Sequence, residues 1–127
     1  MQKQLKAVRL FHETYGLGVS EEMKADLGTL KNELRYNLMK EENEEYLEAV
    51  QNNDIIEIAD ALGDMLYILC GTILEHALQH KIEDIFDEIQ RSNMSKLGED
   101  GQPIYREDGK VMKGPNYFKP NFSDILK

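Results

Sequence analysis

The stretch from residue 58 to residue 74, IADALGDMLYILCGTIL, limits the fold of this chain more than any other segment. It is apolar nearly all round at helical spacing, which predicts a central, buried helix. Its only charged residues are Asp60 and Asp64. At 100° per residue, these two and Glu57 lie within about 60° of one another. Three carboxylates therefore share one stripe of a helix that is predicted to be buried.

A second acidic cluster lies in the preceding sequence EENEEYLEA. Helical spacing places five apolar side chains on one face of a long helix, namely Leu27, Leu30, Leu34, Leu38 and Ala49. Glu41, Glu42 and Glu45 fall inside this face. Taken alone, such a glutamate-rich stretch is typical of a solvated helix surface. The nearby aspartates in the apolar helix favour a shared functional site instead.

Buried carboxylates need protons or cations, because an unpaired buried charge costs several kcal/mol and like charges raise that cost. Only Lys31, Arg35 and Lys40 lie nearby in the sequence, too few to neutralise six acids. Carboxylates without neighbouring His or Cys favour Mg²⁺ or Mn²⁺ over Zn²⁺. The sequence therefore predicts a magnesium site between two helices.

Composition narrows the function further. The 127 residues are 41% hydrophobic, which suits a single domain with a modest core. A formal net charge of −9 disfavours nucleic-acid polymers and anionic membranes as partners. No signal-like N-terminus is evident and the apolar run is too short to span a bilayer, so we expect a soluble, cytoplasmic protein. The single cysteine, Cys70, is expected to be a core residue.

Periodicity predicts four helices. The first covers about 2–15, with Leu5, Val8, Phe11 and His12 on one face. The second runs from about 24 or 27 to 51, and the third begins after Asp54 and continues to about 79. Asp54 is predicted to be the N-cap, with Glu57 at the capping-box position, so Glu57 has a structural interpretation as well. The fourth helix covers about 82–97.

The C-terminal segment after Gly98 differs in composition from the helices, because it contains all three prolines and two Asp-Gly pairs. We expect residues 104–106 and 110–112 to pair across a turn at 107–109, and the tail from Pro115 to fold back over the helices. Five basic residues gather in this segment or just before it, namely Lys96, Arg106, Lys110, Lys113 and Lys119. They suit a lid that binds phosphate, or are ordinary surface residues.

These motifs resemble a known superfamily. The order EExxE, YLEA and then an acidic helix ending in GDMLYIL is similar to the all-α nucleoside triphosphate pyrophosphohydrolases, which include MazG and the all-α dUTP and dCTP pyrophosphatases. VRLFHETYG near the start and RSNMSKLGEDGQPIYREDGKVMKGPNYFKP near the end resemble the phosphoribosyl-ATP pyrophosphohydrolase-like branch. The resemblance covers nearly the whole chain and implies an all-α, four-helix MazG-like bundle with a short C-terminal hairpin.

The resemblance also implies a ligand set for Mg²⁺. The second and third glutamates of EExxE correspond to Glu42 and Glu45. Glu57 and Asp60 satisfy the family's ExxD motif literally, whereas alignment on GDMLYIL makes Asp64 the metal aspartate and places Ala61 where a glutamate is expected. Asp60 and Asp64 are the preferred ligands, and Glu57 is the third candidate.

The implied reaction is hydrolysis between the α and β phosphates, which yields a nucleoside monophosphate and pyrophosphate. Glu41 or Glu45 would hold and deprotonate the attacking water. Candidate contacts to phosphate and sugar are Arg91, Asn93, Lys96, Lys110 and Lys113. Base and sugar specificity stay open, because scattered pocket residues determine them.

Two other functions compete with this interpretation. A di-iron bundle needs Glu-x-x-His pairs, but Glu75 directly precedes His76, and His80 lies further on. A non-enzymatic interaction module with an acidic surface would have solvated acids, and it gives no reason for Asp60 and Asp64 in the apolar helix. In either case an apolar helix in so short a chain needs cover, so we expect a homodimer or homotetramer.

Overall fold

The computed structural model describes residues 1–127 and contains four α-helices. They are α1 (Gln2–Thr14), α2 (Thr29–Gln51), α3 (Ile55–Glu75) and α4 (Ile82–Met94). The predicted all-α class is confirmed. None of the four helices is long and apolar enough to cross a membrane. The chain divides into two compact units, Met1–His80 and Lys81–Lys127, and each is described by itself.

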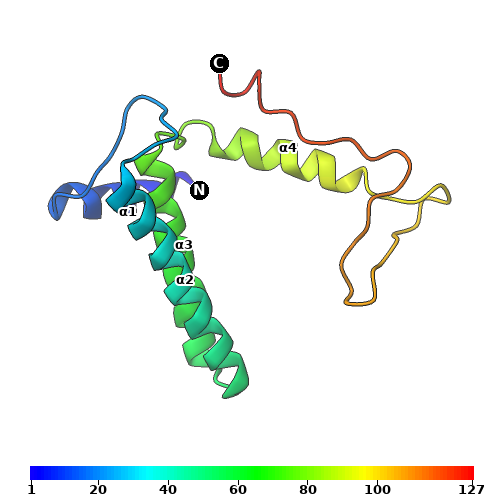
Figure 1. Ribbon diagram of the computed structural model, residues 1–127, viewed down its shortest axis with the longest axis horizontal. Helices are drawn as coiled ribbons and strands as arrows, with labels where there is room; N and C mark the ends of the chain where they lie inside the picture. The colour runs from blue at the N-terminus through cyan, green and yellow to red at the C-terminus, as the bar shows by residue number, and fades with distance from the viewer. The chain divides into compact units, whose positions relative to one another are not determined.

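In the first unit α2 and α3 form an antiparallel hairpin, and α1 packs on α3 (Figure 1). The tight connection between α2 and α3 ends at Asp54, whose side chain accepts the N–H groups of Ile56 and Glu57 at 3.1 Å. Asp54 is therefore the N-cap of α3, as predicted. The reciprocal half of the capping box is absent, because the Asp54 N–H donates to the Ala49 carbonyl instead.

The core of the first unit is small and comes mainly from α3. Its buried apolar residues are Leu5, Val8, Ala49, Ala61, Cys70, Ile73, Leu74 and Ala77. Cys70 is a core residue, as expected. The prediction that α3 is buried all round is wrong for this chain, since Leu62, Leu66 and Leu69 are exposed. Among the helices, α1 and α2 make the main contacts with α3, and these contacts leave Leu62, Leu66 and Leu69 exposed.

The predicted apolar face of α2 is confirmed only in part, since Ala49 is buried and Leu27 and Leu38 are half-buried. Leu30 is 85% exposed and Leu34 is 50% exposed. The only buried residues of α2 are Arg35 and Ala49. Arg35 bonds to Thr72 and Ile68 of α3, whereas Leu30 and Leu34 remain exposed.

Three helices are shorter than predicted. Helix α2 begins at Thr29, because Asp26 accepts from the Gly28 N–H (2.8 Å) and from the Asn32 side chain (2.9 Å), which forms a separate turn before the helix. Helix α3 ends at Glu75 rather than near residue 79. Ala77 adopts a φ of 59°, and Leu78 donates its N–H to the Ile73 carbonyl, which closes the helix end. Helix α4 ends at Met94 rather than near residue 97.

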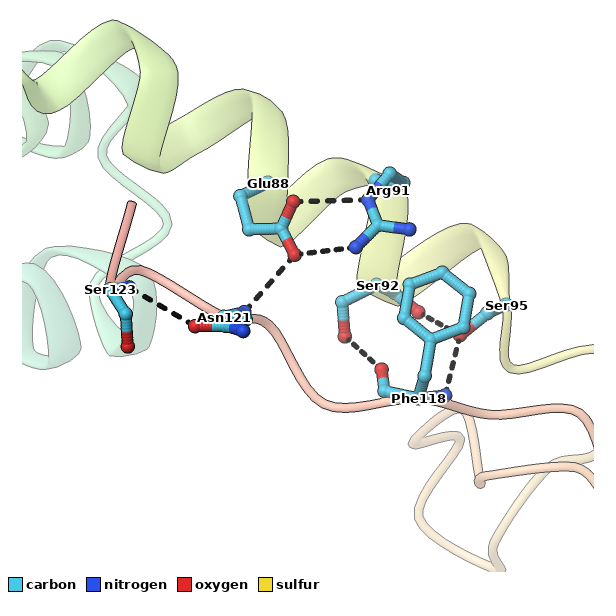
Figure 2. A network of polar contacts seen from close by, with 7 residues as sticks. All are labelled: Glu88, Arg91, Ser92, Ser95, Phe118, Asn121 and Ser123. Carbon is cyan, nitrogen blue, oxygen red and sulfur yellow. Dashed lines mark hydrogen bonds and ion pairs between the residues drawn. The ribbon is translucent and has the colours of Figure 1, made fainter. Parts of the chain in front are cut away.

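The second unit combines α4 with the irregular C-terminal segment. The predicted pairing is confirmed as a single antiparallel bridge between Tyr105 and Val111, supported by a bond from the Arg106 N–H to the Lys110 carbonyl (2.8 Å). The tail lies along α4 (Figure 2). Ser92 donates its hydroxyl to the Phe118 carbonyl (2.8 Å), so the tail is bonded directly to α4.

Candidate metal centre

Three carboxylates from two helices converge on the first unit. Glu42 and Glu45 are one turn apart on α2, and Asp64 comes from the facing part of α3. One oxygen of each side chain lies within 4.8 Å of the others. The antiparallel hairpin brings them together, because it pairs the middle of α2 with the middle of α3. A single cation is therefore within reach of both helices.

Glu42 is the most perturbed member of this group. Burial raises the pKa of Glu42 to about 7, and a hydrogen bond with Glu45 and the charges of Glu45, Asp64 and Asp60 add to the effect. A hydrogen bond between two carboxyl groups requires a proton on one of them. Without a cation the site therefore binds a proton near neutral pH.

The two basic residues nearest in sequence do not neutralise these acids. Lys31 pairs with Glu75 (Nζ to Oε2, 3.1 Å), and Arg35 bonds to the end of α3. None of the six predicted acids on α2 and α3, namely Glu41, Glu42, Glu45, Glu57, Asp60 and Asp64, forms an ion pair. The cluster has carboxylate oxygens and no internal cation.

The predicted depth of the cluster needs correction. Glu45, Asp60 and Asp64 are exposed in this chain, and Glu42 is partly buried. The cluster lies at the surface of the helix pair rather than in an interior, since two of its three members, Glu45 and Asp64, are exposed. The burial cost that motivated the metal prediction therefore applies to Glu42 alone.

The other predicted acids lie at different distances from this group. Asp60 is close enough for its charge to raise the pKa of Glu42. Glu57 lines a neighbouring cleft of about 460 Å³, together with Glu45 and Asp60. Glu41 is exposed and lies outside the cluster.

The donor set fits a hard divalent cation. One oxygen of Glu42, Oε2, is buried and has no hydrogen-bond partner. Orphaned buried oxygens are rare and call for an explanation. An all-carboxylate set matches Mg²⁺ or Mn²⁺, which take oxygen ligands. Glu42, Glu45 and Asp64 are thus the residues that would hold such an ion.

The histidine ligands of a di-iron bundle are not present at this site. The His76 ring Nδ1 lies 2.8 Å from the Lys24 carbonyl oxygen, and the candidate cluster contains no histidine. Together with the missing Glu-x-x-His pairs, this geometry disfavours iron oxygen chemistry.

The predicted phosphate-binding residues belong to the second unit. Arg91 is occupied, since it makes two bonds to Glu88 (2.8 and 3.0 Å) and its guanidinium lies 4.3 Å from the centre of the Phe118 ring. Figure 2 shows the Glu88 pair beside the tail. The other predicted residues are less constrained. Asn93 and Lys96 line a mostly apolar cavity of about 380 Å³.

The two remaining predicted lysines lie in the C-terminal loops of the same unit. Lys110 is on the hairpin, and its backbone N–H donates to Asp108 Oδ1 (3.1 Å). The Lys113 ammonium lies 4.9 Å from the centre of the Tyr117 ring.

A buried polar cluster at the other end of the α2–α3 pair was not predicted. His12, Arg35 and Glu75 are 2%, 8% and 3% exposed. The His12 ring Nδ1 lies 2.8 Å from the Gly18 carbonyl oxygen and 3.8 Å from Glu75 Oε1. The available signals were the place of His12 on the apolar face of α1 and the spacing of Arg35, Glu42 and Ala49, which puts these three on one stripe of α2.

Comparison with known proteins identifies the family. The phosphoribosyl-ATP pyrophosphohydrolase family matches residues 8–93, which include the second half of α1, all of α2 and α3, and nearly all of α4. An uncharacterized protein of Acanthamoeba polyphaga mimivirus is 31% identical over 96 residues. That match covers 74% of this chain and 34% of the relative, so the chain spans about a third of the relative's length. The chain belongs to the phosphoribosyl-ATP pyrophosphohydrolase family, within the MazG-like all-α superfamily.

Proposed function

We propose that this protein hydrolyses a nucleoside triphosphate, or a nucleotide resembling phosphoribosyl-ATP, between its α and β phosphates. The products are a nucleoside monophosphate and pyrophosphate, and the cofactor is Mg²⁺ or Mn²⁺. The main support is the convergence of Glu42, Glu45 and Asp64, together with the partnerless oxygen of Glu42. Membership of a pyrophosphohydrolase family supports the type of reaction.

Each acid has a proposed role. Glu42 and Asp64 hold the metal from two helices, with Asp60 and Glu57 extending the ligand set toward the neighbouring cleft. Glu45 holds the attacking water and takes its proton, and its place inside the cluster favours it over Glu41 for this role. The bound cation would neutralise phosphate charge and stabilise the leaving pyrophosphate.

Basic side chains of the second unit are the proposed phosphate contacts. Lys96 and Lys110 form no ion pair within the chain, so their charges are free to meet a triphosphate. Lys113 and Asn93 complete this set. Arg91 would first have to leave Glu88, which makes it the weaker candidate.

The test is release of pyrophosphate across a panel of nucleotides with Mg²⁺ or Mn²⁺. Glu45→Gln and Asp64→Asn each remove one charge from the cluster and should lower the rate by at least about 100-fold. Glu44→Gln is the matched control, since it removes the same charge from an adjacent, exposed position of α2 outside the cluster. Equal activity of all three variants, or release of inorganic phosphate instead of pyrophosphate, would refute the proposal.

We also propose that the protein is a homo-oligomer. The α2–α3 pair carries a group of apolar side chains that are exposed or half-buried, although 31% of the chain is charged. We call it the apolar face, and it consists of Tyr36, Met39, Tyr46, Val50, Ile55, Leu62, Leu66 and Leu69. A cavity of about 430 Å³ beside it is lined by Tyr36, Met39 and Leu69, together with Arg35 and His76. A second copy suits this face, because an uncharged apolar patch can pack against itself without repulsion.

A further inference from the structure

Few apolar side chains of α2 are buried, so apolar packing alone does not fix how α2 is oriented against α3. Its only buried residues are Arg35 and Ala49, and Leu30 and Leu34 are at least half exposed. A helix normally fixes its rotation through one apolar stripe. The alignment of α2 along α3 therefore needs another determinant.

Arg35 makes the specific contacts between these helices. Its Nε donates to Thr72 Oγ1 (3.0 Å), and its Nη2 donates to the Ile68 carbonyl (2.7 Å). Thr72 donates its own hydroxyl to the same carbonyl (3.0 Å). A backbone carbonyl cannot move through a change of rotamer, so these bonds tie α2 to one position along α3.

The space around the guanidinium is equally specific. A Cβ atom added at Gly71 would lie 2.7 Å from Arg35 Nη2 and 2.7 Å from His12 Nε2. The guanidinium of Arg35 therefore occupies space that is open because residue 71 is a glycine. The flanking residues, Cys70 and Thr72, both have a Cβ atom. A shift of one residue would place the guanidinium against one of these side chains.

Arg35 is on the same stripe of α2 as Glu42, two turns away, which is about 10.5 Å along the helix. Its acceptor Ile68 is one turn beyond Asp64 on α3. A one-residue slip of α2 would move Glu42 by about 1.5 Å along the helix and turn it by about 100°. Such a slip would separate the carboxylates that now lie within 4.8 Å.

We propose that Arg35 is a positioning residue that sets the register between α2 and α3, and so brings Glu42 and Glu45 to Asp64. A buried charged group is a costly contact, and fixing one register is a known use of such groups. The proposal rests on the metal site proposed above. It concerns the alignment of the ligands and assigns Arg35 no contact with substrate.

The first test measures Mn²⁺ binding by the electron paramagnetic resonance signal of free Mn²⁺, without substrate. Arg35→Met keeps the length of the side chain and removes both bonds, so affinity should fall by about 10- to 100-fold, as for other supporting contacts of metal ligands. Arg35→Lys keeps one donor and should fall less. Thr72→Val removes one acceptor and is a second, milder variant in case Arg35→Met does not fold.

The matched control is Leu74→Ala, which removes a fully buried side chain from α3 and costs about 2–5 kcal/mol of stability without touching Arg35. A merely structural role for Arg35 predicts that the folded fraction of every variant binds Mn²⁺ equally. The positioning role predicts weaker binding for the Arg35 and Thr72 variants only. Wild-type affinity in folded Arg35→Met and Arg35→Lys would overturn the proposal.

A metal-free readout separates this proposal from the metal site itself. Nuclear Overhauser contacts between α2 and α3 should be single in the wild type and doubled or shifted in Arg35→Met, whereas the contacts between α1 and α3 in Leu74→Ala should change without a new α2 register. If wild-type protein binds no Mn²⁺, the proposed metal site fails. The spectra then decide the role of Arg35, and unchanged α2–α3 contacts in Arg35→Met would refute it.

Discussion

The carboxylates of Glu42 and Asp64 lie within 4.8 Å of each other although they come from two antiparallel helices. Burial raises the pKa of Glu42 to about 7, above its ordinary value of 4.5, and the neighbouring acids add to the shift. Between these pH values the folded chain binds more protons at Glu42 than the unfolded chain does. The contribution of Glu42 to metal-free stability is therefore unfavourable at pH 8 and is relieved as pH falls through 7 toward 4.5.

This relationship predicts the behaviour of Glu42→Gln. Without metal the variant should melt at a higher temperature than the wild type at pH 8, and the difference should vanish below about pH 4.5. Mg²⁺ at about 100 times its Kd should stabilise the wild type by about 2.7 kcal/mol and the variant hardly at all. Calorimetry at both pH values with and without Mg²⁺ measures this, with Glu44→Gln as the control. Equal stabilisation of both proteins by Mg²⁺ would exclude Glu42 as a ligand.

Local signals in the sequence predicted much of the fold. The four helices follow from apolar periodicity, the Asp54 cap from its place before an apolar run, and the turn at 107–109 from its Asp-Gly pair. The end of α3 was missed because Ala77, rather than a glycine, adopts the left-handed conformation there. Its φ of 59° depends on packing, since Ala77 is buried, and packing leaves no local signal in the sequence.

The candidate site was only partly predictable for a related reason. Spacing along one helix groups Glu42 with Glu45, but which acid of α3 meets them depends on the register between two helices. Arg35 illustrates the difficulty, because its bonds to Ile68 and Thr72 form only in one register between α2 and α3. The sequence could not show that a charged residue, Arg35, makes the polar contacts to α3 while Leu30 and Leu34 stay exposed.

Two glycines of α3 should respond oppositely to the same change. Gly71→Ala places a methyl group 2.7 Å from Arg35 Nη2 and His12 Nε2, so it should destabilise the protein by about 1–3 kcal/mol. Gly63 has no atom within 4 Å of an added Cβ, and Gly63→Ala should stabilise the helix by about 0.5–1 kcal/mol. Urea unfolding of both variants gives the comparison. A stable Gly71→Ala would mean that Arg35 and His12 do not occupy these positions in solution.

The apolar face predicts the effect of a single charge on assembly. Leu66 is 43% exposed on this face, and Leu66→Glu would place an unpaired carboxylate in the proposed interface. Light scattering should then give the mass of one chain, 14.7 kDa, where the wild type gives a multiple of it. Leu30→Glu is the control, because Leu30 is 85% exposed on a different side of α2. A wild type that is already monomeric, or an equal effect of both variants, would refute assembly through this face.

The last prediction concerns the C-terminal tail, which is bonded to α4 at several points. Ser92 is 2% exposed and donates to the Phe118 carbonyl, while Phe118 donates its N–H to Ser95 Oγ (3.2 Å). Ser92→Ala leaves a carbonyl of the tail without its donor and should cost about 1 kcal/mol of local stability. Chymotrypsin should therefore cut after Tyr117, directly before the anchored Phe118, about five times faster in Ser92→Ala than in the wild type, because cleavage follows the population of the open tail.

Ser123→Ala is the control for this measurement, since the Ser123 hydroxyl makes no hydrogen bond to α4, and the backbone N–H of Ser123 donates to Asn121 Oδ1 (3.1 Å). It should be cut at the wild-type rate. If Ser92→Ala and Ser123→Ala are cut equally, the hydroxyl of Ser92 does not hold the tail, and the remaining bond from the Asn121 N–H to Glu88 (3.1 Å) would have to be sufficient. Cleavage of Glu88→Gln, in which that acceptor loses its charge, then distinguishes the two anchors.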